Sequence, residues 1–221
     1  MKKMKTLFEM NYDTNLVTEI VREECQWAIN GEGKATVKID GTAAIFLNGK
    51  LHKRFDRKLR KKFSLKNKRL GGKLAIEDHM FKDLPLGAIA CQLPDPITFH
   101  QPFWVEVTDS PEDRWFQEAL SLHPVLIEGA TYELIGEKVQ NNIYNIKGHK
   151  LVPHGAEEIN DILLTYDGIK KWLFNNYVEG IVFHHPDGRM CKIRRKDMFV
   201  FKNSSNDRLN DWTSVIEGYP S

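Results

Sequence analysis

Residues 35–46 read ATVKIDGTAAIF, the pattern of a β-strand that carries charge. Val37 falls on one face by the two-residue alternation of an extended chain, and Lys38 and Asp40 fall on the other. Gly41 follows at once and allows a tight turn or a close backbone approach. Because charged side chains are rarely buried unless they are paired or bound to a ligand, this stretch predicts a strand that presents a lysine and an aspartate to a functional site.

Working outward from this stretch, the sequence predicts a mostly antiparallel α+β fold. Asn48-Gly49 separates two apolar runs and is a strong hairpin signal. Pro186-Asp187-Gly188 marks a second turn between strands. Further strands are expected in TYELIG (131–136), VEGIVF (178–183) and CKIRR (191–195), and helices in WFQEALSLH (115–123) and TYDGIKKWLFNN (165–176), the second capped by Thr165.

Composition fits one soluble domain that spans residues 1–221. Hydrophobic residues make up 41% of the chain, enough for a sizeable core, and the net charge is only +2. The three cysteines lie far apart and match no zinc pattern, which indicates a reducing compartment. The sequence has no apolar run long enough for a signal peptide or a membrane span. We therefore expect a cytoplasmic monomer that has no contact with a membrane.

Charged residues recur on the other predicted strands. Glu179 is expected to share a face with Ile181 and Phe183, and Lys192 to share one with Arg194. For any single strand, the charged residues are explained if that face of the sheet lies in solvent. The set as a whole supplies a lysine nucleophile, further cations and isolated carboxylates, which are the parts that a nucleotidyl-transfer site needs.

The chemistry of such a site assigns a role to each group. An amine that attacks the α-phosphate of a nucleotide must be neutral, and the cations Lys192 and Arg194 would favour the neutral form of Lys38. They would also neutralise charge on the phosphate. Mg²⁺ or Mn²⁺ takes hard oxygen ligands such as those of Glu179 and Asp40. The remaining expectations are Glu133 for the ribose hydroxyls and Ile181 or Phe183 for packing against the base.

The motif KIDG resembles the K-x-D-G nucleophile motif of the covalent nucleotidyltransferase superfamily, which comprises DNA ligases, RNA ligases and mRNA capping enzymes. The order of KIDG, RFDRK, TYELIG, VEGIVF and CKIRRKD makes the resemblance specific. The longer stretches YELIGEKVQNNIY, LVPHGA and EGIVFHHPDG are most similar to ATP-dependent 5′–3′ RNA ligases of the vertebrate RNA-repair type. The resemblance extends over residues 36–197 and implies a nucleotidyltransferase (ATP-grasp-like ligase) domain of mostly antiparallel sheets with flanking helices.

The resemblance implies a reaction through lysyl-AMP and an adenylylated RNA 5′ end, which joins 5′-phosphate and 3′-hydroxyl RNA ends with ATP and Mg²⁺ or Mn²⁺. By motif position, the implied roles are Lys38 as nucleophile, Asp40 as its partner, Arg54 on phosphate or ribose, Glu133 on the ribose, Glu179 on the metal, and Lys192 and Arg194 on the α-phosphate. The last motif departs from the usual K-x-K, because it reads Lys192-Ile193-Arg194. Lys196 is an alternative if the strand continues that far.

Residues 53–73 form a basic run with eleven lysines and arginines and one acid. We expect it to track RNA phosphates, which makes binding salt-dependent, or else to be a solvated loop. The cations expected nearest to RNA are Arg57, Lys58, Lys61 and Lys62.

Two other functions stay open at this point. One is a GTP-dependent mRNA capping guanylyltransferase, and the other is a non-catalytic RNA-binding relic of the fold. After the last motif about 25 residues follow, too few for the OB domain that DNA ligases and capping enzymes usually carry. That length favours an RNA ligase.

Overall fold

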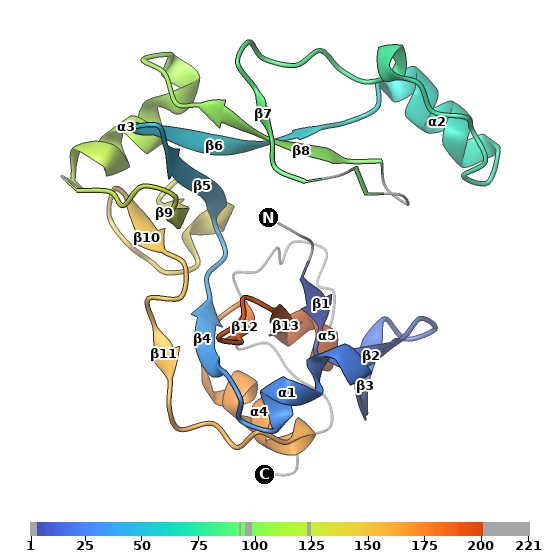
Figure 1. Ribbon diagram of the computed structural model, residues 1–221, viewed down its shortest axis with the longest axis vertical. Coiled ribbons are helices and arrows are strands. Elements are labelled where there is room, and N and C mark those ends of the chain that lie inside the picture. The colour runs from blue at the N-terminus through green and yellow to red at the C-terminus, as the bar shows by residue number, and fades with distance from the viewer. Residues whose placement is uncertain (1–3, 93, 96–98, 123–124, 201–221) are drawn as a thin grey trace.

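The computed structural model describes residues 4–92, 94–95, 99–122 and 125–200. They form an α+β fold of two main, mostly antiparallel β-sheets with few helices (Figure 1). A third sheet is the two-stranded hairpin of β2 (Phe8–Asn11) and β3 (Leu16–Val21).

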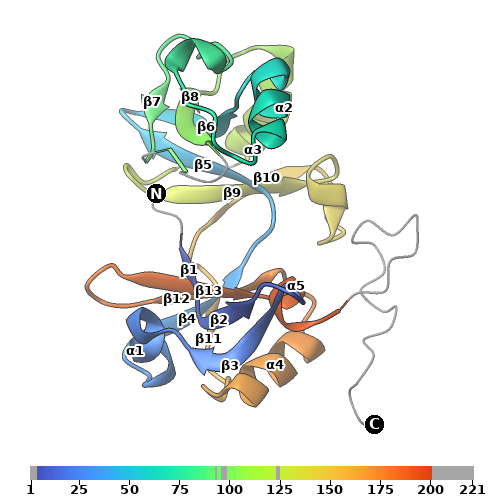
Figure 2. The same ribbon diagram turned by 90° about the vertical axis from the view of Figure 1, so that its right-hand side faces the viewer.

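The first main sheet has five strands in the order β1-β13-β12-β4-β11. Its strands are β1 (Lys5–Thr6), β4 (Lys34–Lys38), β11 (Glu158–Ile159), β12 (Gly180–His184) and β13 (Met190–Arg194). Only β1 and β13 run parallel among its described pairs. The helices beside it are α1 (Gln26–Ile29), α4 (Tyr166–Asn175) and α5 (Arg195–Met198), with the 3-10 turn η1 (Glu23–Cys25) ahead of α1 (Figure 2).

The second main sheet has six antiparallel strands in the order β10-β9-β5-β6-β8-β7. Its strands are β5 (Thr42–Leu47), β6 (Lys50–Arg57), β7 (Ile89–Ala90), β8 (Gln101–Glu106), β9 (Thr131–Gly136) and β10 (His149–Pro153). The helices in this half are α2 (Lys61–Arg69) and α3 (Arg114–Ser121), and the 3-10 turns are η2 (Asp78–Met80), η3 (Pro111–Asp113) and η4 (Gln140–Asn142).

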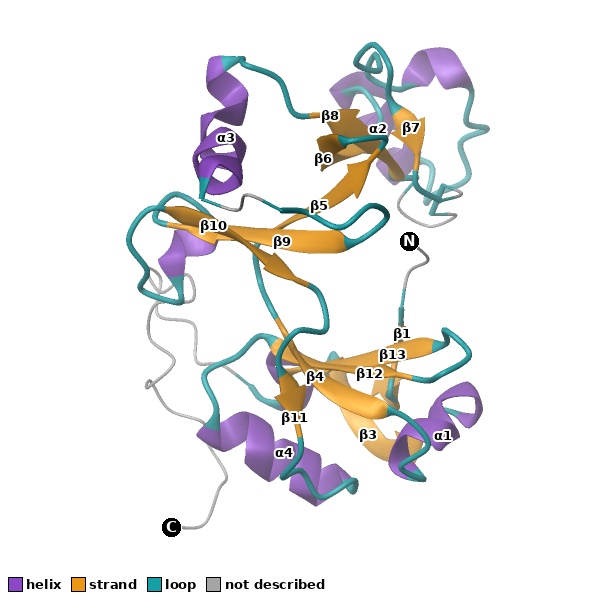
Figure 3. Cartoon of the chain, turned by 60° about the vertical axis from the view of Figure 1, so that its left-hand side comes forward, coloured by secondary structure: helices purple, strands orange, loops and turns teal. Residues whose placement is uncertain are grey.

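Two short connections join the sheets. Residues 39–41 lead from β4 to β5, and residues 154–157 lead back from β10 to β11 (Figure 3). Each sheet has its own apolar core: one includes Ile181, Phe183 and Leu173, and the other includes Tyr132 and Leu134. One of the two crossings between the cores is therefore the end of the KIDG stretch.

Most of the predicted local structure is confirmed. Asn48 and Gly49 both have positive φ, at 53° and 74°, as a two-residue hairpin turn requires. The Thr165 side chain accepts a hydrogen bond from the backbone N–H of Gly168, 3.1 Å away, and so caps α4. The structure differs at the basic run, where residues 61–69 form the helix α2 and not a loop.

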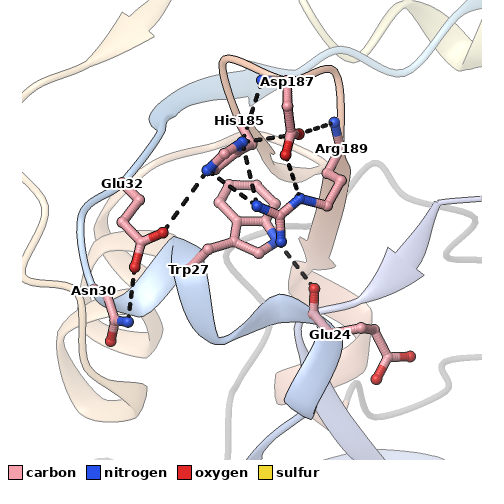
Figure 4. A network of polar contacts seen from close by, with 7 residues as sticks. All are labelled: Glu24, Trp27, Asn30, Glu32, His185, Asp187 and Arg189. Atoms are coloured by element: carbon pink, nitrogen blue, oxygen red, sulfur yellow. Dashed lines mark hydrogen bonds and ion pairs between the residues drawn. The ribbon is translucent and has the colours of Figure 1, made fainter.

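A polar network fixes the β12–β13 turn to helix α1 (Figure 4). Asp187 accepts hydrogen bonds from the backbone and side chain of Arg189, at 2.9 and 2.8 Å, and contacts the His185 ring. The rings of His185 and Trp27 meet edge to face, 5.2 Å between centroids, and the Arg189 guanidinium lies over the Trp27 ring. The network thus links the turn that leads into β13 to helix α1.

No helix in the described ranges is long and apolar enough to cross a membrane.

Candidate active site

Lys38 is the last residue of β4, where the chain leaves the five-stranded sheet. Its Nζ forms an ion pair with the carboxylate of Glu179, which lies just before β12. Each of the two side chains is 20% exposed. Lys38 and Glu179 therefore form a partly buried ion pair that a ligand can still reach.

Lys192 lies on the same face of the sheet as Lys38. Gly180 of β12 is paired with Lys38 of β4 on one side and with Arg194 of β13 on the other. Val182, two residues further along β12, is paired with Lys192 of β13. Because directly paired residues share a face, the side chains of Lys38, Val182 and Lys192 project from one side. The predicted grouping of the two lysines is present in the structure.

The ammonium of Lys192 is in an unfavourable environment for a charge. Burial, and then the cations Arg194 and Lys38, lower the pKa of Lys192 to about 8. Glu179 and Asp197 offset this effect only in part. The ammonium of Lys192 would therefore be stabilised by an anion such as a phosphate group.

Arg194 already has an anionic partner. Its guanidinium makes two hydrogen bonds to the Asp197 carboxylate, at 2.9 and 2.7 Å, and this contact raises the pKa of Arg194. The strand ends at Arg194, and Lys196 belongs to α5. The alternation that would place Lys196 on the lysine face therefore does not extend to it.

Gly41 lies against the six-stranded sheet. A Cβ atom at this position would be 2.2 Å from the Leu134 carbonyl oxygen and 2.8 Å from the Cγ of Glu133. The Gly41 N–H donates a 3.1 Å hydrogen bond to the Glu133 carboxylate. Close backbone approach, one of the two predicted uses of this glycine, is what the turn requires.

Three carboxylates lie near one another at this turn. Burial raises the pKa of Asp40, the charges of Glu179 and Glu133 raise it further, and Lys38 opposes the shift. Mutual repulsion of this kind is relieved by a bound cation. In the described part of the chain, however, no group of three or more His, Cys, Asp and Glu side chains is placed so that it could hold a metal ion.

Two residues that the sequence reading missed contact this turn. Tyr144 accepts a 2.6 Å hydrogen bond from the Asp40 N–H, and His154 Nε2 lies 2.7 Å from the Glu133 carboxylate. The other ring nitrogen of His154 lies 2.9 Å from the Thr131 hydroxyl. Both residues fall inside stretches that carry the family resemblance, YELIGEKVQNNIY and LVPHGA, which was the available signal.

The expectation that Ile181 or Phe183 packs against a base needs correction. They are 0% and 1% exposed, in the core on the opposite face of the sheet from Lys38. Glu179 precedes β12, so strand alternation does not link its side chain to theirs. Val182 is the apolar side chain that projects between the lysine-bearing strands on the correct face.

Arg54 lies on the six-stranded sheet and not on the sheet that carries the two lysines. It is on β6 opposite Trp104, its Nε donates a 3.0 Å hydrogen bond to Asp56, and its side chain is 34% exposed. Lys38 and Lys192 lie on the five-stranded sheet, whereas β6 belongs to the six-stranded sheet. A role for Arg54 at the phosphates or ribose stays a prediction.

The basic run divides into structural and exposed cations. Arg57 is 8% exposed and binds Asp78, Gln101 and the Lys82 carbonyl, so it is a structural residue and the expectation that it faces RNA is wrong for this conformation. Lys58 is exposed. Helix α2 buries none of its side chains, and no ion pair with a described residue engages its exposed cations, which are Lys61, Lys62, Lys66, Lys68 and Arg69.

Comparison with known proteins places the chain in a family. Residues 94–219 match the family model "RNA ligase 1", and this match begins downstream of Lys38 but includes Glu133, Glu179 and Lys192. RNA ligase 1 of Rattus norvegicus is 29% identical over 81% of this chain and 71% of that protein. RNA ligase 1 of Pongo abelii is 35% identical over 29% of this chain and 23% of that protein.

The family model covers more than half of the sequence, so the chain belongs to the RNA ligase 1 family. The predicted likeness to RNA ligases of this type is thereby confirmed.

Proposed function

We propose that this chain is an ATP-dependent RNA ligase that joins 5′-phosphate and 3′-hydroxyl RNA ends. The observation that carries the proposal is the lysine pair: Lys38 at the crossing between the sheets, paired with Glu179, and Lys192 on the same face. Membership of the RNA ligase 1 family supports the substrate class. On this proposal the fold is a covalent nucleotidyltransferase domain.

The reaction would proceed in three group transfers. The neutral amine of Lys38 attacks the α-phosphorus of ATP, so a phosphorus–nitrogen bond forms and the bond to pyrophosphate breaks. An oxygen of the RNA 5′-phosphate then attacks lysyl-AMP and takes the AMP. In the last step the 3′-hydroxyl attacks the activated 5′-phosphate, the phosphodiester bond forms and AMP leaves.

Lys192 would supply the main electrostatic stabilisation. Its desolvated ammonium lies on the face of Lys38 and gains a partner when a phosphate binds there. Since binding to an anion favours the ammonium, Lys192 would hold the α-phosphate more tightly as negative charge builds on it. Arg194 would assist through its charge, while its guanidinium stays bound to Asp197.

A divalent cation fits the carboxylates beside Lys38. Glu179 and Asp40 would hold it, with the remaining ligands from water or the nucleotide, as Mg²⁺ usually takes them. Bound there, the ion would supply neutralising charge to the phosphates. With Glu179 engaged in this way, Lys38 loses its anionic partner, and its neutral, nucleophilic form becomes easier to reach.

The remaining proposed contacts are those to the ribose and to the base of the nucleotide. Glu133 already accepts the Gly41 N–H on one oxygen, and its other oxygen lies 2.7 Å from His154 Nε2. Each carboxylate oxygen has a second lone pair with which to accept a ribose hydroxyl. Val182, on the lysine face, replaces Ile181 and Phe183 as the proposed apolar contact for the base.

Helix α2 would bind the RNA backbone. Its like-charged lysines Lys62 and Lys66 are one turn apart and repel each other, so a polyanion lying along the helix relieves that repulsion. Lys61 begins this helix, and the exposed Lys58 lies just before it. This arrangement predicts affinity for phosphates without base specificity.

An RNA-joining assay tests the proposal. Purified protein is incubated with a 5′-phosphorylated RNA strand, a 3′-hydroxyl strand, Mg²⁺ or Mn²⁺, and either ATP or GTP. We expect a joined product with ATP that is absent with Lys38→Ala. Joining supported by neither nucleotide would contradict the proposal, and transfer of GMP from GTP to an RNA 5′ end would indicate a capping enzyme.

A further inference from the structure

The loop between β9 and β10 contacts the turn that carries Lys38. We call residues 139–148 the clamp loop. The phenol oxygen of Tyr144 accepts the Asp40 N–H at 2.6 Å, and the side-chain amide of Gln140 donates to the Gly41 carbonyl at 3.3 Å. One loop thus engages backbone groups of two consecutive residues directly after Ile39 and the lysine.

The clamp loop has an unusual backbone. Gln140, Asn141, Asn142 and Asn145 all have positive φ, between 45° and 59°, although none is glycine. Such conformations cost free energy and persist only when surrounding contacts enforce them. The contacts include reciprocal hydrogen bonds between the Asn142 side chain and the backbone of Ile146, at 2.9 and 3.1 Å. The loop is therefore held in one strained shape.

Tyr144 lies among charged groups that the proposed reaction uses. The carboxylates of Asp40, Glu179 and Glu133 lie near its phenol. The phenol oxygen accepts the Asp40 N–H, and its own proton stays available to an acceptor. A neutral hydroxyl adds no charge that would compete for the lysine or for a cation.

We propose that the clamp loop positions the lysine nucleophile, with Tyr144 as the main positioning residue and Gln140 as the second. By holding the peptide groups of residues 40 and 41, the loop fixes the direction in which β4 ends and so where Lys38 points. This inference rests on the proposed function, because it assigns a task within lysyl-AMP formation. It does not require Tyr144 to touch the reacting atoms.

The proposal separates the steps of the reaction. Forming lysyl-AMP and passing AMP to RNA both break or form a bond at Lys38, whereas sealing RNA that is already 5′-adenylylated does not. Loss of the clamp should therefore slow the first steps and spare the last. A purely structural role for Tyr144 would weaken all three steps together.

The test compares Tyr144→Phe with wild type. In single-turnover reactions with α-labelled ATP, we expect lysyl-AMP formation to slow about tenfold, the effect of losing one well-aligned hydrogen bond. The KM for ATP and the sealing of 5′-adenylylated RNA should change little. Gln140→Ala should slow the same step less, and the double variant at least as much as Tyr144→Phe.

Tyr12→Phe is the matched control, since Tyr12 is 81% exposed and should behave as wild type. Equal or faster labelling of Tyr144→Phe, or an equal loss in sealing of adenylylated RNA, would overturn the positioning role. If wild type itself forms no lysyl-AMP, the proposed function fails, and the two failures are thereby distinguished.

Discussion

Lys38 and Lys192 project from one face of the five-stranded sheet, on strands that flank β12. Lys38 is paired with Glu179, whereas Lys192 is desolvated and repelled by other cations. The two lysines thus have different electrostatic states in one site, which suits a nucleophile and a phosphate-binding cation.

The pH dependence of lysyl-AMP formation should report Lys192. It is cationic below its pKa of about 8 and neutral above it, so its stabilisation of the phosphate is lost as pH rises. Lys192→Arg keeps the charge at all these pH values. We expect the ratio of kcat/KM for ATP, variant over wild type, to rise up to about tenfold per pH unit above 8. A ratio that does not vary with pH would contradict the assignment.

Stability should respond to Lys192 in the opposite way to activity. Because the folded protein lowers the pKa of Lys192, the unfolded chain binds that proton more tightly between pH 8 and 10.5. Wild-type stability should therefore gain from this group as pH rises through that range. Lys192→Met should raise the free energy of unfolding at pH 7 by about 1–2 kcal/mol, allowing for solvent screening.

Urea denaturation at pH 7 and pH 9.5 measures both effects of Lys192. Lys171→Met, an exposed position on α4, is the control and should change stability little. A Lys192→Met variant less stable than wild type at pH 7 would show that burial does not penalise this ammonium.

Gly41→Ala should damage both stability and catalysis. Its Cβ would be 2.2 Å from the Leu134 carbonyl oxygen, a backbone atom that cannot move aside cheaply. We expect a loss of about 1–3 kcal/mol in the free energy of unfolding, as for overpacking, and loss of lysyl-AMP formation. Gly71→Ala adds a Cβ in open space at a φ of +60° and should cost only about 1 kcal/mol without affecting labelling. Full labelling by Gly41→Ala would contradict the need for close approach.

Neutralising helix α2 should weaken RNA binding and leave nucleotide chemistry intact. For the triple variant Lys61→Gln, Lys62→Gln and Lys66→Gln, the slope of log affinity against log salt should fall by about 2–3, near 0.7–0.9 for each lost phosphate contact. The measurement is RNA binding by fluorescence anisotropy at several salt concentrations. Lys50→Gln with Lys171→Gln is the control, and an unchanged slope in the triple variant would exclude α2 as the RNA surface.

The strands and helices were predictable where local signals were strong. The Asn48-Gly49 turn, the Thr165 cap and the Glu133 strand all have short-range patterns that tertiary contacts did not override. Helix α2 was missed because its segment has no apolar face to bury, and periodicity is the usual helix signal.

The site was predictable in part. Lys38, Glu179 and Lys192 were placed by motif and alternation, and the structure brings them together. Two-residue alternation wrongly placed Ile181 in the site together with Glu179. Glu179 lies before β12 begins, so strand alternation does not apply to its side chain. Tyr144 reaches Asp40 from a loop more than a hundred residues away, a contact that only the fold reveals.

The most direct measurement is mass spectrometry of the purified protein after incubation with ATP and Mg²⁺ or Mn²⁺. The account predicts one added AMP, localised to Lys38 in the proteolytic map and absent from Lys38→Ala. AMP on a different residue such as Lys192, or no adduct on folded protein that was free of AMP at the start, would contradict it.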